Sequence, residues 1–555
     1  MLLSILLAFS IQDAGPEVGL RYRSPEAEPG YVLIAPLKSK STYLIRKQDG
    51  KVAHQWRSSE LPGNSVYLMD NGDILRATAP KGNEVFSGGG AGGGLQRISA
   101  SSELLWEFSW SDDMRRAHHD LEPMPNGNLL LISWEYKSPA EAFEAGRNPD
   151  ELSERGLWPD YVVELKPPTM LGEEPKVIWE WHAWDHLVQD FAESRENFGV
   201  VGDAPGRIDL NGDLVSMSEQ DRERAKRVEE DMKGLGYIGD DEADDAGEDA
   251  TDDATDDATD DATDDATDDA TDDAAGDAAL VVDGPTNRDK GKERKKGGDW
   301  LHTNGIDYDP VNDVILLSSR VFSEIWMIDH STTTAQAASN TGGRFGKGGD
   351  LIWRWGNPQK YDAGLDSDQK LFRQHDARFI PEGFPGAGNV TVYNNGEGRP
   401  AGRFSTVEEL ALPWNKERNG FPMFSDAFGP TKPTWQVGDS KGSGELFFFS
   451  SFISGAERLQ SGNTMICVGA SGRVIEVSPE GKVVWEYISP FQEPIKEGGA
   501  PPRGPGPPGD RGPGGPRPPG AGPDAGKRPP SSLKNALFRA TPISPRHPGI
   551  EALER

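Results

Sequence analysis

The feature of this sequence that most limits its fold is an internal repeat of two short motifs. The first motif ends in an aromatic pair and occurs as KVAHQW (51–56), ELLWEF (103–108), KVIWEW (176–181), DLIWRW (350–355), PTWQV (433–437) and KVVWEY (482–487). The second is a turn followed by an apolar run, as in DNGDILRA (70–77), PNGNLLLI (125–132), DPVNDVILL (309–317), GAGNVTVY (386–393), GSGELFFF (442–449) and SGNTMICV (461–468). Asn-Gly pairs supply the positive φ angles of tight hairpins, and β-branched or aromatic runs between such turns are typical of strands. The sequence therefore predicts an all-β chain of repeated hairpins.

The spacing of the first motif predicts the architecture. Aligned with the six-residue copies, its fourth position falls at His54, Trp106, Trp179, Trp353, Trp435 and Trp485. The first and last spacings, 52 and 50 residues, are close to one four-stranded propeller blade of about 40–50 residues. Six copies therefore predict a six-bladed β-propeller, a ring with only short, protected strand edges. An irregular β-sandwich is the alternative, and the segment 535–543 is expected to return and complete a blade.

Net charge separates an acidic insert from the rest of the chain. The sequence carries 91 Asp and Glu against 58 Lys and Arg, a formal net charge of −33. Residues 240–277 hold 20 of these acids and no base, and without them the net charge is −13. We therefore expect the segment 239–278, with its six TDDA repeats, to be a disordered insert. So acidic a chain is not expected to bind nucleic acid, because that binding depends on Lys and Arg against phosphate.

A second segment of biased composition, 499–530, is rich in Pro and Gly and is typical of a flexible spacer. The 15 Trp, 21 Phe and 11 Tyr of the chain supply enough large side chains for a substantial core. We therefore predict a single propeller domain over 19–555, interrupted by the acidic insert and by this Pro/Gly-rich insert. Cys467 is the only cysteine, so an intramolecular disulfide is impossible.

The N-terminal sequence MLLSILLAFSIQDAG contains an apolar run of about ten residues. This length is typical of a signal peptide and is too short to span a bilayer. We expect residues 1–18 to be a signal peptide and the protein to be exported to the periplasm or the cell exterior; a buried first strand is the alternative. No other segment approaches transmembrane length, so no membrane span is expected.

Three of the nine histidines occupy one place in the repeat. His119, His302 and His375 each stand at the start of the strand that leads into a turn, in three successive repeats. Equivalent positions of neighbouring blades meet near the central channel of a propeller, so we expect these side chains to face one another. The adjacent His118 leaves open which histidine of that pair does so. Satisfaction of backbone groups by polar side chains is the alternative reading.

Polar neighbours extend this group. Asn304 follows His302 by two residues, on the same face of an extended strand, and Arg320 ends the next apolar run. Asp120 and Asp376 each follow a histidine, and can either orient a ring nitrogen or point away. Imidazoles, a guanidinium and an amide suit a tetrahedral oxyanion, since Arg and Asn donate to its oxygens while a neutral imidazole attacks. Three histidines could instead bind Zn²⁺, for which Arg320 would be a poorly placed cation.

At these residues the chain resembles a known family, the PAPS-independent arylsulfate sulfotransferases of bacteria. The resemblance runs from GYVLIAPLKSKSTYLIRKQDGKVAHQW to GNTMICVGASGRVIEVSPEGKVVWEY, and is strongest in HHDLEPMPNGN, DWLHTNGIDYDPVNDVILLSSR, GGDLIWRWGNP and QHDARFIPE. It implies a periplasmic six-bladed propeller that moves a sulfuryl group from an aryl sulfate ester to a phenolic acceptor. The spacing of His302, Asn304 and Arg320 is the most specific part of the match.

The resemblance also implies roles. His375 would be the nucleophile that forms a sulfohistidine, while His302, Asn304 and Arg320 would hold the sulfuryl oxygens. His119 would help to bind the group or handle the phenolic proton. No metal or other cofactor is implied, the partners would be an aryl sulfate donor and a phenol acceptor, and a homodimer is one assembly to consider.

The sequence departs from the family pattern in three respects: the inserts, the missing disulfide and the turn Asn394-Asn395-Gly396, where the family has Asp-Asn-Gly. We expect the change in the turn to be neutral. Two other functions stay open on the sequence alone. One is a non-catalytic propeller that binds sulfated or anionic ligands, and the other is a histidine-rich, metal-dependent enzyme.

Overall fold

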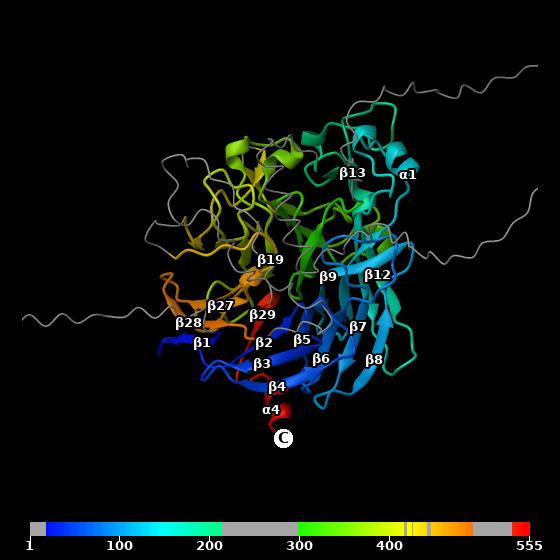
Figure 1. Cartoon of the computed structure of the whole chain (residues 1–555). Coiled ribbons are helices and arrows are strands. Elements are labelled where there is room, and N and C mark those ends of the chain that lie inside the picture. Colours follow the sequence, from blue (N-terminus) through cyan, green and yellow to red (C-terminus); the bar gives the residue numbers. More distant parts are fainter. Residues whose placement is uncertain (1–17, 214–297, 416–418, 425, 441–445, 492–534) are drawn as a thin grey trace, which may run out of the picture. The chain divides into compact units, whose positions relative to one another are not determined.

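The computed structural model describes residues 18–213, 298–415, 419–424, 426–440, 446–491 and 535–555 (Figure 1). Its main strands form six antiparallel sheets, and each sheet is one propeller blade. Listed from the innermost strand outward, the first blade is β29 (Leu537–Ile543), β2 (Tyr31–Pro36), β3 (Ser41–Arg46) and β4 (Val52–Arg57), and the second is β5 (Pro62–Leu68), β6 (Ile74–Thr78), β7 (Gly94–Ile98) and β8 (Leu104–Ser109). The third blade is β9 (Arg115–Pro123), β10 (Leu129–Glu135), β11 (Asp160–Lys166) and β12 (Lys176–His182), and the fourth is β15 (Thr303–Asp309), β16 (Val314–Ser319), β17 (Glu324–Asp329) and β18 (Trp353–Trp355). The fifth blade is β19 (His375–Phe379), β20 (Val390–Asn394), β21 (Thr406–Leu410) and β24 (Trp435–Val437), and the sixth is β25 (Gly455–Arg458), β26 (Thr464–Val468), β27 (Arg473–Val477), β28 (Val483–Ile488) and β1 (Gly19–Arg23).

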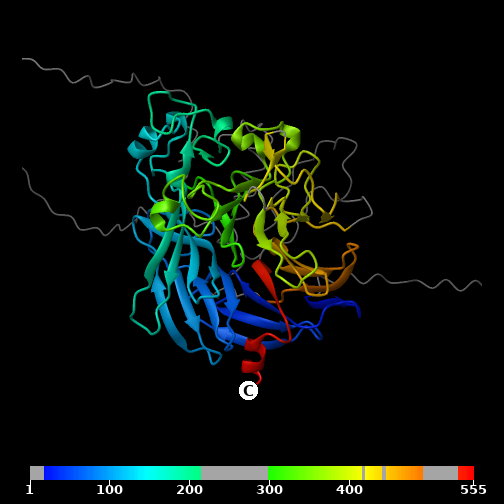
Figure 2. The ribbon, with the colours of Figure 1, turned by 180° about the vertical axis from the view of Figure 1, so that it is seen from behind.

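The six innermost strands close a ring, because each contacts the next in the order β29, β5, β9, β15, β19, β25 and back to β29. The prediction of an all-β, six-bladed propeller is therefore confirmed. The smaller elements are β13 (Leu187–Val188), β14 (Ile208–Asp209), β22 (Met423–Phe424), β23 (Ala427–Phe428), α1 (Pro139–Glu144), α3 (Thr334–Ala337) and α4 (Pro548–Leu553). Figures 1 and 2 show α1 and β13 at the end of the view opposite α4.

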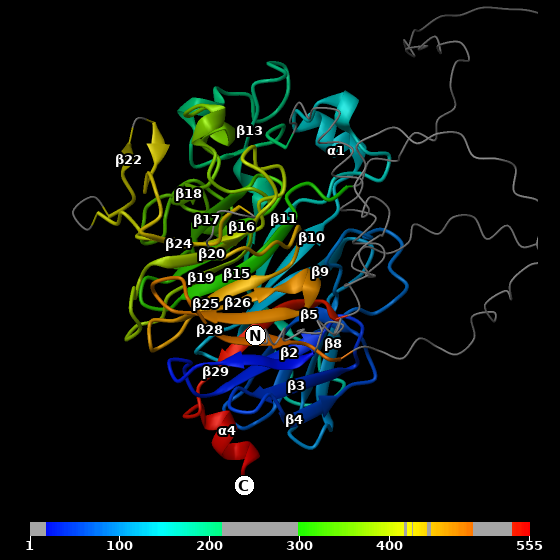
Figure 3. The same cartoon turned by 60° about the vertical axis from the view of Figure 1, so that its left-hand side comes forward.

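Both ends of the described chain complete blades. β29 pairs antiparallel with β2, with Leu33 opposite Thr541, and Figure 3 shows the two strands side by side. β1 adds a fifth strand to the blade that ends in β28. The return of 535–543 to the propeller, expected from the sequence, is thus observed as the innermost strand of the first blade.

The repeated fourth position of the first motif links neighbouring blades. It lies on the outermost strand of the repeat, and in five of six copies its ring nitrogen bonds the connection between the third and fourth strands of the next blade. The bonds are His54 to Ala100 O, Trp179 to Thr332 Oγ1, Trp353 to Gly429 O, Trp435 to Pro479 O and Trp485 to Lys47 O. Buried indoles need a hydrogen-bond acceptor, so a repeated Trp also fixes the orientation of the neighbouring blade.

The predicted turns are present, with one exception. Gly72 and Gly127 have φ angles of 86° and 85° in hairpin turns, a conformation that favours glycine. GSGELFFF was expected to form a turn and strand, but the described part of it, 446–449, is irregular. Its Phe448 packs instead in the core beside β20 and β26. In the remaining blade the corresponding second strand is β2, which neither set of repeat motifs includes.

Several predicted segments lie outside the described residues. They are residues 1–17 of the predicted signal peptide 1–18, the acidic insert 239–278 and the Pro/Gly-rich insert 499–530. Cys467 lies buried in β26 and is not part of a disulfide.

Candidate active site

The three predicted histidines lie in, or immediately before, three adjacent inner strands. His119 lies in β9, His302 immediately precedes β15 and His375 begins β19. Pairing with the second strand shifts register at each of these places. His119, His302 and Asp376 also have positive φ angles of 53°, 52° and 52°. Bulges and left-handed residues of this kind re-aim side chains and concentrate at functional sites.

These residues lie close together. The ring centroids of His119 and His302 lie 4.5 Å apart. His375 and Arg320 are close enough that their charges act on His119. His119, His375 and His302 are only 0 %, 1 % and 8 % exposed, so the site is almost sealed from bulk water. The structure thus brings together the side chains that the sequence placed in register.

His375 is bound by neutral groups. Its Nδ1 lies 2.8 Å from Oδ1 of Asn395, whose amide nitrogen donates to the carbonyls of Ser450 and Ile453. The amide oxygen can only accept, so Nδ1 carries the proton and Nε2 the lone pair. The backbone N–H of Ile453 donates to that lone pair at 3.1 Å. Burial first, and then the charge of Arg320, hold the pKa of His375 well below its usual range.

His302 is bound by a carboxylate. Its Nδ1 bonds Oδ2 of Asp299, and the other oxygen of Asp299 accepts a 3.0 Å hydrogen bond from the Trp134 indole. Burial alone would raise the pKa of Asp299, but His302 and then the Trp134 N–H hold it below its usual value. Nε2 of His302 is buried and has no hydrogen-bond partner among the described residues. That nitrogen is the one available for a ligand.

His119 is bound by a second histidine. Its Nδ1 lies 2.8 Å from Nδ1 of His118, which turns away and stacks on Trp134 at 4.0 Å between ring centroids. His119 is therefore the histidine of the pair that faces His302. A Cβ on Gly90 would lie 2.2 Å from its Nε2, so only glycine leaves room there. Burial first, and then His302, hold the pKa of His119 well below its usual range.

Arg320 and Asn304 complete the predicted set. The backbone of Arg320 is held by the carbonyl of His302, and its charge acts on both His119 and His375. Asn304 is fully buried; its amide nitrogen donates to Gln374 O at 2.8 Å. Its Oδ1 has no partner among the described residues. The second N–H of that amide is the one left for a substrate oxygen.

The structure adds residues that sequence reasoning missed. Asn395 and Asp299 fix ring nitrogens of the site histidines, and Arg373 lies two residues before His375. Burial, and then the nearby charge of Arg320, lower the pKa of Arg373 to about 10. The guanidinium of Arg373 makes no hydrogen bond or ion pair with the described residues. The position of Arg373 just before QHDARF was its only sequence signal. Asp299 is the first residue of the block DWLHTNGIDYDPVNDVILLSSR, but nothing in the sequence assigned it a role.

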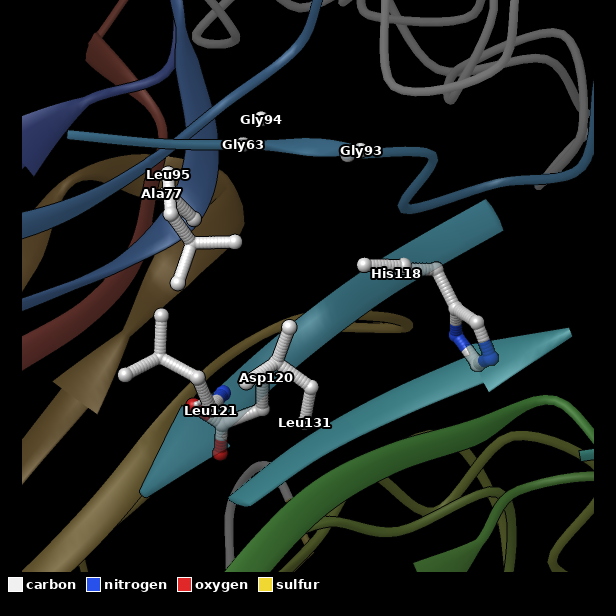
Figure 4. Close-up of a pocket in the computed structure, with 11 residues that line it drawn as sticks. Gly63, Ala77, Gly93, Gly94, Leu95, His118, Asp120, Leu121 and Leu131 are labelled. Carbon is white, nitrogen blue, oxygen red and sulfur yellow. Dashed lines mark hydrogen bonds between the residues drawn. The ribbon is translucent and has the colours of Figure 1, made fainter. Parts of the chain in front are cut away.

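Asp120 and Asp376 do not orient the histidines. Asp120 lies 2.6 Å from Arg539, and Asp376 lies 2.7 Å from Arg539 and 2.9 Å from Arg378. Figure 4 shows Asp120 and His118 leaving β9 at separate points beside a small pocket that Gly63, Gly93 and Gly94 also line. Of the two orientations left open by the sequence, the one pointing away from the histidines is therefore correct.

The donor set suits an anion better than a cation. Three imidazoles, an amide and the two arginines converge, and oxyanions are held by such fixed donors in sites that exclude water. Among the described residues, no group of three or more His, Cys, Asp and Glu is arranged to hold a metal ion. No helix in the described part of the chain is long and apolar enough to cross a membrane.

Comparisons with known proteins were made for the sequence and for the fold. A family model described as Arylsulfotransferase (ASST) matches residues 97–489. No curated protein matches the sequence. Similar solved structures include a protein of unknown function from Bacteroides caccae, with 12% identity, coverage of 83% of this chain and 93% of that chain, and a TM-score of 0.35. Another is a functionally unknown protein from Desulfotomaculum acetoxidans, with 8% identity, coverage of 82% and 95%, and a TM-score of 0.32. These scores are too low to carry an argument.

Proposed function

Because the chain belongs to the arylsulfotransferase family and is an arylsulfate sulfotransferase, we propose that it works through a covalent sulfohistidine at His375. The family implies an aryl sulfate donor and a phenol acceptor. One observation carries the proposal: His375 alone of the three site histidines has its Nδ1 bound to a neutral amide. A neutral imidazole with its lone pair on Nε2 is the form that can attack sulfur.

In the first half-reaction Nε2 of His375 forms a bond to sulfur, and the S–O ester bond breaks. The electron pair of that bond leaves on the phenolic oxygen, which takes a proton. The Ile453 N–H must release the lone pair as sulfur approaches. Ile453 has a φ of 48°, a strained value for a β-branched residue, so its contact with Nε2 is not held by a relaxed backbone.

The other residues hold the charge of the transferred group. Asp299 holds the ring of His302 by its Nδ1, which leaves Nε2 to face a sulfuryl oxygen and to donate to it when it carries the proton. Arg320 supplies a planar fork of donors that fits two oxygens, and Asn304 adds one amide N–H. In the second half-reaction the acceptor phenol attacks sulfur, the N–S bond breaks and its electron pair returns to His375.

The test is mass spectrometry of protein quenched after exposure to 4-nitrophenyl sulfate without an acceptor. The expected result is a gain of about 80 Da, the mass of one SO₃ group, on the peptide that contains His375. His375→Asn should lose both the adduct and turnover. An adduct on another residue, or full turnover in His375→Asn, would refute the assignment. Stoichiometric metal by elemental analysis, with turnover lost on its removal, would favour the metal-dependent alternative.

The place of action is a separate part of the proposal. The apolar N-terminal run supports export to the periplasm or cell exterior. Expression of the full chain in a bacterium with an outer membrane, followed by fractionation and N-terminal sequencing, tests it. Uncleaved protein confined to the cytoplasm would contradict it.

A further inference from the structure

Behind His119 lies a buried chain of hydrogen bonds that the roles above do not use. Nδ1 of His119 is 2.8 Å from Nδ1 of His118, and Nε2 of His118 is 3.1 Å from Oδ1 of Asp160. The second oxygen of Asp160 accepts the backbone N–H of Thr303 at 2.7 Å. His119, His118 and Asp160 are 0 %, 2 % and 3 % exposed. A chain of hydrogen bonds that ends at a carboxylate can carry a proton on more than one of its ring nitrogens.

The carboxylate sets the tautomers. An ionised Asp160 can only accept, so Nε2 of His118 carries a proton. In neutral His118 Nδ1 is then the acceptor, and Nδ1 of His119 donates to it. Nε2 of His119, the nitrogen beside Gly90, carries the lone pair. This assignment follows from the donors and acceptors of the network alone.

We propose that Asp160, His118 and His119 form a proton relay that delivers a proton to the leaving phenol and takes one from the acceptor phenol. The proposal rests on the sulfotransfer reaction proposed above. His118 and Asp160 are positioning residues in it, since only His119 reaches the reacting oxygen.

The steps balance. When the acceptor hydroxyl gives its proton to Nε2 of His119, the Nδ1 proton of His119 passes to Nδ1 of His118. The positive charge then lies on His118, next to Asp160, and His119 is neutral with its proton on Nε2. The donor half-reaction, which comes first, therefore starts from this charged form: Nε2 of His119 gives its proton to the leaving oxygen, the Nδ1 proton of His118 returns to Nδ1 of His119, and the phenol leaves protonated. The relay is then neutral, with the lone pair on Nε2 of His119, and is ready for the acceptor hydroxyl. One complete transfer neither consumes nor releases a proton.

The surroundings of His119 explain why the charge must move on. Burial first, and then the neutral or positive neighbours His302, His118, His375 and Arg320, hold the pKa of His119 low, so an imidazolium there is disfavoured. His118 contacts Asp160 and stacks face to face on Trp134 with an interplanar angle of 12°. A cation over an indole face beside a carboxylate is a stable arrangement.

Two substitutions distinguish a proton-carrying role of this network from a purely structural one. In His118→Gln the side-chain oxygen can accept from Nδ1 of His119 and the amide can donate to Asp160, but no proton is carried. In Asp160→Asn the hydrogen bond to Thr303 can remain, while the charge is lost. His330→Gln is the matched control, because both ring nitrogens of His330 are also bonded to side chains, Asp313 and Glu164, away from the site.

The readout is kcat/KM with two donors: 4-nitrophenyl sulfate, whose phenolate leaves without help, and phenyl sulfate, whose phenolate needs a proton. In both variants kcat/KM should fall by about 10²–10⁴-fold with phenyl sulfate and by less than about tenfold with 4-nitrophenyl sulfate. The control should show no such difference. The activity that remains with 4-nitrophenyl sulfate shows that each variant is folded.

Equal losses with the two donors in both variants, or no loss in either, would overturn the relay. Absence of sulfuryl transfer by the wild-type protein from either donor would instead overturn the proposed function. The two failures are therefore distinguishable in one experiment.

Discussion

Nδ1 of His375 lies 2.8 Å from the side-chain oxygen of Asn395, whereas the corresponding ring nitrogen of His302 bonds the carboxylate of Asp299. A neutral amide leaves an imidazole neutral and nucleophilic, whereas a carboxylate can balance positive charge that is placed beside the ring. Two histidines of one site are thus prepared for different tasks by the groups behind them. Separation of this kind is how one pocket performs both attack and charge stabilisation.

The first prediction concerns Asn395→Asp. A carboxylate at Nδ1 should raise the pKa of His375, which burial and Arg320 hold low in the wild type. Since only neutral His375 attacks, the acid limb of adduct formation should move to higher pH, by about 1–3 units. Rapid-quench mass spectrometry across pH measures it. Asn419→Asp, an exposed control, should keep the wild-type profile, and the same profile in Asn395→Asp would contradict the prediction.

The second prediction concerns the arginines. Arg320→Ala should slow adduct formation by about 10²–10³-fold, since one fixed donor to the sulfuryl oxygens is lost. Arg320→Lys should recover part of this loss, because it keeps the charge but not the fork. Arg373→Gln should act mainly on KM for the donor, because Arg373 adds positive charge beside Arg320. Single-turnover kinetics separate the two effects, and equal rates for Arg320→Ala and wild type would refute the role of Arg320.

Much of the fold could be predicted from the sequence, because the repeat reflects a repeated physical need. The Trp at the fourth position recurs because its indole bonds the next blade, as Trp485 does at Lys47 O. The segment GSGELFFF matches the turn-and-strand motif, yet its described part is irregular. A short apolar run after a glycine turn does not reveal whether a partner strand is within reach.

Less of the site could be predicted. The register of His119, His302 and His375 was visible, but a strand alternation rule could not show that Asp120 and Asp376 turn to Arg539. The positive φ angles at His119 and Asp376 break that alternation, and they are a property of the backbone. Asn395 looked like a neutral turn residue, since its role depends on a contact 20 residues away.

The third prediction uses the channel beyond the histidines. Glu122, Asp307 and Glu457 lie there near Arg378. Burial, and next the charge of Asp307, raise the pKa of Glu122 to about 8. An unfolded Glu titrates near 4.5, so between about pH 4.5 and 8 the folded state holds a proton that the unfolded state releases. Stability should therefore fall as pH rises through this window.

Glu122→Gln removes that titration, and its amide oxygen can still accept from Arg378. Relative to wild type, the free energy of unfolding of the variant should rise by on the order of 2 kcal/mol at pH 8 and should stay unchanged at pH 4. Thermal unfolding over this pH range measures it, with the exposed Glu173→Gln as control. A gain of the same size at both pH values would show that the effect does not come from the Glu122 proton.

The last prediction concerns closure of the ring by β29. Arg539 in that strand bonds Asp120 in β9 at 2.6 Å and Asp376 in β19 at 2.7 Å, so one guanidinium joins three inner strands. Arg539→Ala leaves two buried carboxylates with Arg378 as their remaining cation, at a cost of about 3–5 kcal/mol in the free energy of unfolding. Burial raises the pKa of Asp120, but Arg539 and Arg378 outweigh burial and hold that pKa below its usual value. The stabilisation that the ionised Asp120 gives the folded state should therefore be lost as the pH falls through the folded-state pKa. The free energies of unfolding of variant and wild type, measured in urea at pH 7 and at pH 3, should therefore differ less at pH 3. An equal difference at both pH values would assign the loss to packing of the arginine stem rather than to its charge. The exposed Arg546→Ala should change neither curve.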